Sequence, residues 1–213
     1  MEDPAEARAY AGADFSEPHS HIIKAFERKF PDVEIKGNIL DLGCGPGDIT
    51  LRFARRFPEA RIIGVDGSAA MIELAEERRA REPDVAERIT FVRGRIPGAP
   101  IPPLDYGAIV TNSLLHHLLR PKILWETIAG YARPGAIIFV VDLMRPASIE
   151  EAQGMVEKYS GAEPEILKRD FYNSLLAAFS PSEVEEQIRE AGLSELKVKK
   201  ISDRHFAAYG VKG

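Results

Sequence analysis

Three glycines at alternate positions separate an apolar, strand-like run from an amphipathic, helix-like run. The apolar run covers residues 38–42, Gly43, Gly45 and Gly47 follow it, and the helical pattern covers residues 48–57. Glycine adopts positive φ angles without strain and lets a ligand approach the backbone closely. Because ligands of open α/β sheets bind at the carboxyl ends of the strands, this turn predicts a ligand site at the edge of a parallel sheet.

The alternation of strand-like and helix-like runs continues beyond this turn. It predicts an α/β fold with a parallel sheet, because βαβ units place consecutive strands side by side in the same direction. Four more strands are expected at 61–65, 89–93, 108–111 and 136–142, and two more helices at 68–81 and 122–131.

The two ends of the chain depart from this alternation. A helix is expected at 18–30, before the first strand. Residues 145–179 have the pattern of two helices, which we interpret as an insertion over the sheet and not as a second domain. A last helix is expected at 181–191, followed by strands at 195–201 and 205–211 that form a hairpin around 202–204. We expect the sixth strand to run parallel to its neighbours.

The composition predicts one globular domain with neither a nucleic-acid nor a membrane partner. The 213 residues are 45% hydrophobic and 29% charged, with a net charge of −5, whereas duplex-binding domains carry a basic patch. The longest uncharged apolar run, 136–141, is far shorter than the ~20 residues that span a bilayer. The acidic start is unlike a signal peptide, and the single cysteine, Cys44, allows no intrachain disulfide, so we expect a cytoplasmic protein.

Two acidic residues stand in register with the glycine turn. Asp41 lies two residues before Gly43, and Asp66 lies 19 residues beyond Gly47, at the end of the next strand. A carboxylate beside the turn suits an ammonium better than a pyrophosphate, and the G-x-G-x-G spacing differs from the G-x-G-x-x-G of dinucleotide loops. An acid at the end of the second strand can accept both hydroxyls of a ribose. The pattern therefore predicts a nucleoside ligand without a 2′-phosphate, and we assign Cys44 to packing.

These segments resemble a known enzyme family. Residues 41–47, Asp-Leu-Gly-Cys-Gly-Pro-Gly, resemble motif I of class I S-adenosylmethionine-dependent methyltransferases, and residues 65–68 resemble their second signature. Residues 112–118, Asn-Ser-Leu-Leu-His-His-Leu, are similar to the segment after strand four in the small-molecule branch, which includes ubiquinone and menaquinone biosynthesis enzymes. The resemblance covers about residues 35–143.

The resemblance implies a fold and a reaction. The fold would be a Rossmann-like, seven-stranded, mostly parallel sheet with an antiparallel last strand and helices on both faces. The reaction would be in-line transfer of a methyl group from S-adenosylmethionine to a small molecule, with S-adenosylhomocysteine as the product. One methyltransferase domain would then cover residues 1–213, with an N-terminal helical cover at 1–34, a cofactor-binding core at 35–144, an inserted helical cap at 145–180, and the last helix and hairpin at 181–213.

The resemblance also implies roles for single residues. Asp41, the glycines and Asn112 would hold the methionine end of the cofactor, Asp66 the ribose, and Met71 would pack near the adenine. Family members often carry an acid after strand three that receives the adenine amino group. Arg95 stands there in this chain, so either the backbone around Arg95 and Ile96 holds the adenine or Arg95 stacks on it. The predicted cofactor-binding set is Asp41, Gly43, Gly45, Gly47, Asp66, Gly67, Ser68, Met71, Arg95, Ile96, Asn112, Ser113 and His117.

Histidines are the candidates for positioning the methyl acceptor and for removing its proton. Methyl transfer needs alignment and exclusion of water, and it needs a base only where the acceptor carries a proton. The topology brings His116 and His205 to the carboxyl edge of the sheet, and we predict them as catalytic residues. His19, His21 and Tyr172 are predicted to bind the substrate, and no metal is expected. The alternative is that each histidine has a packing or surface role.

Three other functions remain open at this point. A nicotinamide-dependent oxidoreductase would share the fold but use a different glycine spacing. A non-catalytic S-adenosylmethionine-binding protein, or an enzyme that uses this cofactor for another reaction, would share all the motifs. A nucleic-acid methyltransferase is disfavoured, because the chain is acidic and Asn112 is followed by Ser113 and Leu114 instead of an Asn-Pro-Pro-aromatic signature. The oligomeric state has no signal in the sequence.

Overall fold

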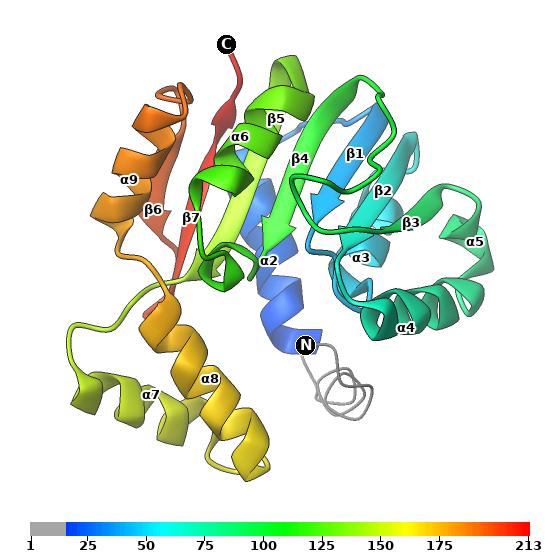
Figure 1. Ribbon diagram of the computed structural model, residues 1–213. Helices are drawn as coiled ribbons and strands as arrows, with labels where there is room; N and C mark the ends of the chain where they lie inside the picture. The colour runs from blue at the N-terminus through cyan, green and yellow to red at the C-terminus, as the bar shows by residue number, and fades with distance from the viewer. Residues whose placement is uncertain (1–15) are drawn as a thin grey trace.

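A seven-stranded sheet forms the centre of the computed structural model, which describes residues 16–213, with side chains from residue 20 onward (Figure 1). The strand order is β3-β2-β1-β4-β5-β7-β6. The strands are β1 (Gly37–Leu42), β2 (Ala60–Asp66), β3 (Ile89–Arg93), β4 (Tyr106–Asn112), β5 (Ala132–Leu143), β6 (Lys197–Lys200) and β7 (His205–Val211). The mostly parallel Rossmann-like sheet expected from the sequence is thereby confirmed.

The pairing at one side of the sheet corrects the prediction for the sixth strand. β1 to β5 pair in parallel, β7 pairs antiparallel with β5, and β6 pairs antiparallel with β7. The expectation that β6 runs parallel to its neighbour was wrong, because a hairpin makes its two strands antiparallel. Two reversals nevertheless give β6 the direction of β1 to β5. The turn between β6 and β7 therefore opens on the same edge as the glycine turn.

Helices cover both faces of the sheet (Figure 1). α2 and α3 pack on one face, and α6 and α9 pack on the other. The helices are α2 (Ser16–Lys29), α3 (Asp48–Arg56), α4 (Ala69–Ala80), α5 (Pro83–Ala86), α6 (Lys122–Tyr131), α7 (Ile149–Ser160), α8 (Glu165–Ala177) and α9 (Pro181–Glu190), with a 3₁₀ turn, η1 (Leu115–His117). The sequence predicted all of these except α5 and η1, with most bounds shifted by one or two residues.

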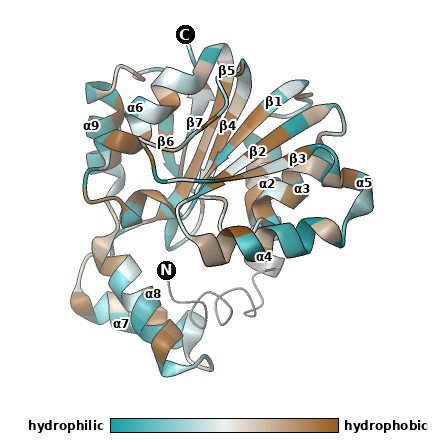
Figure 2. Cartoon of the chain, turned by 45° about the vertical axis from the view of Figure 1, so that its right-hand side comes forward, coloured by the Kyte–Doolittle hydropathy of each residue, from teal (hydrophilic) through white to brown (hydrophobic). Residues whose placement is uncertain are grey.

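The pair α7–α8 lies beyond the carboxyl edge of the sheet and not on one of its faces (Figure 1). It has a small apolar cluster of its own, in which Leu143 at the end of β5 meets Leu175 and Ala178. Figure 2 shows the apolar strands in the middle of the molecule and this mixed helix pair set apart from them. The expected insertion therefore extends the edge at which the glycine turn opens.

One aromatic ring fastens α2 to the sheet. Phe26 is fully buried, and its ring packs edge-on at 5.2 Å from Phe53, 5.7 Å from Phe57 and 5.3 Å from Phe139, measured between ring centroids. These partners come from α3, from the residue after α3, and from β5. Edge-to-face packing adds to the burial of apolar area, so the expected N-terminal helix belongs to the core.

Replacing Phe26 with Ala is expected to lower the free energy of unfolding by about 3–5 kcal/mol, since it removes a large buried ring and leaves a cavity. Urea titration followed by circular dichroism measures this. The control is Leu119→Ala, because Leu119 is fully exposed and its truncation is expected to cost less than about 0.5 kcal/mol. Equal losses in the two variants would show that α2 is not packed as described.

Candidate functional site

The glycine turn closes the carboxyl end of β1 onto β2. The backbone N–H groups of Gly43 and Cys44 both donate to the Val65 carbonyl, at 2.8 and 3.0 Å. Gly43, Gly45 and Gly47 have φ angles of +70°, +51° and +81°. A side chain at Gly47 would also lie 2.9 Å from the Phe91 ring. Backbone conformation and crowding both require glycine there.

The space around Gly45 is different. A β-carbon added to Gly45 would meet no heavy atom within 4 Å among the described residues, whereas one added to Gly43 would lie 3.0 Å from Leu114. The middle of the turn thus faces open space, while its two ends are packed. This is the arrangement that lets a ligand reach the backbone of the turn.

Asp66 joins the turn to the start of α4. Its Oδ2 accepts a hydrogen bond from the Gly45 N–H at 2.9 Å, and its Oδ1 accepts one from the Ser68 N–H at 2.8 Å. The residue is half-buried. A carboxylate can accept about four hydrogen bonds in all, so Asp66 retains acceptor capacity for a ligand that lies over the turn.

Asp41 is a buried carboxyl beneath the turn. It is 1% exposed, and its Oδ2 accepts a hydrogen bond from the Thr50 hydroxyl of α3 at 2.5 Å. Desolvation raises the pKa of Asp41 to about 7, the Thr50 hydrogen bond lowers it, and the nearby Asp66 carboxylate raises it further. Asp41 therefore changes charge near neutral pH, and a cation beside it would favour the ionised form.

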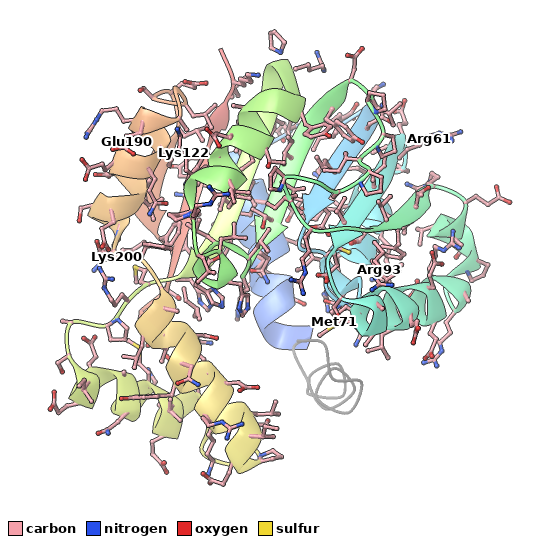
Figure 3. All side chains as sticks on the ribbon, viewed as in Figure 1. Arg61, Met71, Arg93, Lys122, Glu190 and Lys200 are labelled. Carbon is pink, nitrogen blue, oxygen red and sulfur yellow. The ribbon has the colours of Figure 1, made fainter. Side chains whose placement is uncertain are left out.

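The residues predicted near the adenine lie around α4 and the end of β3. Met71 is buried in the first turn of α4, which Ser68 caps by accepting a hydrogen bond from the Met71 N–H at 3.3 Å. The Arg95 side chain crosses over Gly67, because a β-carbon added to Gly67 would lie 2.7 Å from Arg95 Cγ. Ile96 follows and is half-buried. In Figure 3, Met71 and Arg93 lie toward this edge, whereas Arg61 lies at the opposite end of β2.

The end of β4 lies against the glycine turn. Asn112 and Ser113 are half-buried, and Ser113 has a positive φ of 57° with its N–H bonded to the Val141 carbonyl at 2.9 Å. This left-handed residue turns the chain out of the sheet. Leu114 then packs on Gly43, which places η1 directly beside the turn.

A carboxylate that the sequence pattern did not single out holds one of the histidines, His116. Asp142, 1% exposed at the end of β5, lies 2.5 Å from His116 Nδ1 through Oδ1. Its two oxygens also accept hydrogen bonds from the N–H groups of Leu115 at 2.7 Å and Leu143 at 2.8 Å. The one signal for it in the sequence is an acid at the last position of an otherwise apolar strand pattern, 136–142.

The structure brings three histidines to this edge. The rings of His116 and His117 lie 4.1 Å apart between centroids, with His116 buried and His117 exposed. His205 pairs with Leu143 across β7 and β5, and its Nδ1 lies 3.1 Å from the Ser202 hydroxyl. Burial, followed by the Arg204 cation, lowers the pKa of His205 to about 4, so His205 is neutral at pH 7.

The predicted substrate-binding residues are less closely gathered. His21 is exposed on α2, the side chain of His19 lies outside the described residues, and Tyr172 is half-buried on α8. α8 packs against η1, so Tyr172 belongs to an element beside the histidines. Between residues 16 and 213, no group of three or more His, Cys, Asp and Glu side chains is placed to hold a metal ion, and no helix is long and apolar enough to cross a membrane.

Comparison with known proteins identifies relatives of the segment that carries this geometry. Residues 39–135 match a family of methyltransferase domains. The matched segment, less than half of the chain, is therefore similar to the core of methyltransferase domains. The matched segment contains the glycine turn, Asp66 and η1, whereas Asp142 and His205 lie beyond it.

Relatives with known names match the same core. An uncharacterised methyltransferase of Mycobacterium tuberculosis is 30% identical over 109 residues, which cover 51% of this chain and 52% of the relative. A trans-aconitate 2-methyltransferase of Methylobacterium nodulans is 36% identical over 132 residues, covering 62% of this chain and 46% of the relative. The chain thus spans about half the length of the curated relatives it matches. No specific likeness to the ubiquinone enzymes appears among these relatives.

Solved structures extend the similarity to the whole fold. The plantazolicin methyltransferase BpumL in complex with S-adenosylhomocysteine has a TM-score of 0.74 at 18% identity, covering 99% of this chain and 91% of that one. A SAM-dependent methyltransferase from Aquifex aeolicus has a TM-score of 0.70 at 16% identity, covering all of both chains. At these identities the likeness establishes the fold alone.

Replacing Asp41 with Asn is expected to stabilise the ligand-free protein, increasingly as the pH rises. A folded-state pKa of about 7 against about 3.9 in the unfolded chain means that ionisation of Asp41 opposes folding between these values. Asn keeps the shape and can accept the Thr50 hydrogen bond. The gain over the parent should grow by at least about 1 kcal/mol between pH 5 and pH 8, measured by urea unfolding.

Asp105→Asn is the control for this experiment. Asp105 is exposed, so its neutralisation is expected to leave the free energy of unfolding nearly unchanged at both pH values. A destabilised Asp41→Asn protein at pH 8 would show that the buried carboxylate is compensated by groups other than Thr50.

Proposed function

We propose that the protein is an enzyme that transfers the methyl group of S-adenosylmethionine to a small-molecule acceptor. The observation that carries this proposal is the placement of Asp66, which is held at the open middle of the glycine turn by Gly45 and Ser68. Two carboxylate oxygens at this point suit the two hydroxyls of a ribose. The methyltransferase family match and the named relatives support the same reading.

The residues present fit the proposed cofactor. Open space over Gly45 would admit the ligand. The carboxylate of the buried Asp41 would attract the ammonium of the cofactor. Asn112 ends the adjacent strand β4, and Ser113 follows it directly. Met71, Gly67 and Ser68 would enclose the adenosine, together with Arg95 and Ile96 in place of the usual acid. When bound, the cofactor supplies a methyl group on a positively charged sulfur.

The protein would contribute by aligning the acceptor with the methyl group and by excluding water from both. Positive charge on sulfur is dispersed as the methyl group leaves, so the enzyme needs a fixed geometry and a dry site more than a strong electrostatic field. α7 and α8 lie at the edge where the acceptor would enter, and α8 carries Tyr172. We propose that this pair closes over the acceptor, with His116, His117 and His205 on the floor below it.

The organisation of the chain follows from the same proposal. Residues 1–213 would act as one methyltransferase domain with a helical cover, a cofactor core, a cap and a terminal hairpin. The acidic charge favours a small-molecule acceptor over a nucleic acid, and a cytoplasmic location fits the use of S-adenosylmethionine. The relatives named for trans-aconitate suggest small organic acids, including those that also carry a hydroxyl group, as first acceptors to assay.

Asp66→Ala is expected to weaken S-adenosylhomocysteine binding at least tenfold. The variant loses two charge-assisted hydrogen bonds to the ribose, each worth about 1.5–3 kcal/mol. Isothermal titration calorimetry of the parent should show binding of S-adenosylhomocysteine and none of NAD. The matched control is Glu73→Ala, an exposed acid on α4, which should bind like the parent. Tight NAD binding by the parent would refute the proposed cofactor.

The reaction itself is tested with a methyl-labelled cofactor. The protein is incubated with methyl-labelled S-adenosylmethionine and a metabolite extract, and label is expected to appear in a small molecule. Asp66→Ala should reduce that labelling at a fixed, subsaturating cofactor concentration. Binding of the cofactor without any labelled product would point to a sensor or storage protein.

A further inference from the structure

We infer that Asp142 is a positioning residue that makes His116 the proton acceptor of the reaction, and that the methyl acceptor is a hydroxyl group, not a carboxylate. This inference rests on the proposed function and deepens it by naming the acceptor class. It starts from the buried contact between His116 Nδ1 and Asp142 Oδ1.

The contact determines which ring nitrogen of His116 carries hydrogen. Asp142 accepts hydrogen bonds from Leu115 and Leu143 with both oxygens, so it is oriented as an acceptor and His116 Nδ1 must donate to it. The neutral ring then has its lone pair on Nε2. Nε2 is then the ring nitrogen of His116 that can accept a proton.

The position of His116 suits removal of a proton from the methyl acceptor. η1 follows Leu114, which packs on Gly43 of the turn, and α8 of the cap packs on η1. His116 therefore lies between the proposed cofactor loop and the proposed cover. A histidine whose only task was to cap η1 would not need a buried carboxylate behind it, because desolvating that carboxylate costs free energy.

The other two histidines at this edge are neutral at pH 7, because desolvation lowers the pKa of His117 and the pKa of His205 to about 4. The charged groups described around the cluster are Asp142 at the end of β5 and Arg204 and Asp203 in the turn before β7. Asp142 is the one in contact with His116, so it would stabilise an imidazolium formed there, as a buried acid does behind a catalytic histidine.

The chemical step balances without any further reagent. The acceptor hydroxyl gives its proton to His116 Nε2 while its oxygen forms a bond to the methyl carbon. The carbon–sulfur bond breaks and its electron pair stays on sulfur, which leaves neutral S-adenosylhomocysteine and a methyl ether. The imidazolium of His116 then releases its proton to solvent. A carboxylate acceptor is already ionised at pH 7 and would give this base nothing to do.

Two variants remove the proposed base or its charged partner while keeping the local packing. In His116→Asn the amide nitrogen can replace Nδ1 as the donor to Asp142, but no atom replaces Nε2. In Asp142→Asn the carboxylate charge beside His116 Nδ1 is lost, so an imidazolium formed at His116 is no longer stabilised. General bases contribute about 10²–10⁴-fold to rate, so we expect each variant to lose at least a hundredfold in methyl transfer with little change in KM.

The product test uses the labelled metabolite extract, so the chemistry of the product identifies the acceptor class directly. A methyl ether survives mild alkali and releases labelled methyl iodide in hydriodic acid, whereas a methyl ester releases labelled methanol in mild alkali. Trans-aconitate methyl ester is the reference for the second behaviour. We expect the ether result and a loss of label with His116→Asn. Labelled methanol, or a His116→Asn protein within threefold of the parent, overturns the inference.

A spectroscopic readout is independent of the acceptor. With ¹⁵N-labelled histidine, the five histidines give few signals, and those missing in His116→Asn belong to His116. We expect hydrogen on Nδ1 and an unprotonated Nε2 at pH 8. Hydrogen on Nε2 in the parent overturns the inference. Failure of the proposed function would give a different result from failure of this inference. Calorimetry would then show no cofactor binding, whichever tautomer His116 has.

Discussion

The turn between β1 and α3 depends on the absence of three side chains. A β-carbon at Gly43 would crowd Leu114, and one at Gly47 would crowd Phe91. Residues other than glycine would also strain the positive φ angles of the turn. These angles bring the Gly43 N–H and the Cys44 N–H to the Val65 carbonyl. This closure brings β2 alongside and lets Asp66 reach back to the Gly45 N–H. The edge of the sheet is therefore assembled around backbone atoms, which leaves the middle of the turn open to a ligand.

Periodicity predicted most of this architecture, because it reports burial along each segment. The bounds of β3 and α6 match the predicted 89–93 and 122–131. The start of β5 could not be predicted in the same way. β5 begins at Ala132, four residues before its apolar run, and Ala132 pairs with Tyr106 of β4. Further along, the Gly135 N–H donates to the Lys212 carbonyl and the Lys212 N–H donates to the Ala136 carbonyl, both at 2.8 Å. A pairing between segments so far apart leaves no local pattern.

The residues of the candidate site likewise differ in how well the sequence predicts them. Asp41, Asp66 and the glycines occupy fixed offsets from strand ends, so their spacing in the sequence was enough to predict that they lie together. The strand order and the hairpin likewise account for His116 and His205 sharing an edge. Asp142 was missed because its partners, Leu115 and His116, lie 27 and 26 residues earlier. Its role depends on the direction in which one side chain leaves the end of β5, and a hydropathy pattern does not contain that direction.

Two buried carboxyls at this edge differ in how their desolvation is compensated. Asp142 accepts hydrogen bonds from two backbone N–H groups and one imidazole, whereas Asp41 has the Thr50 hydroxyl, and its pKa rises to about 7. A single neutral donor leaves Asp41 as a group that becomes charged when a cation arrives. Under the proposed function, the ammonium of the cofactor would be that cation. Binding would then restore part of the stability that the protein loses by burying Asp41 without a charged partner.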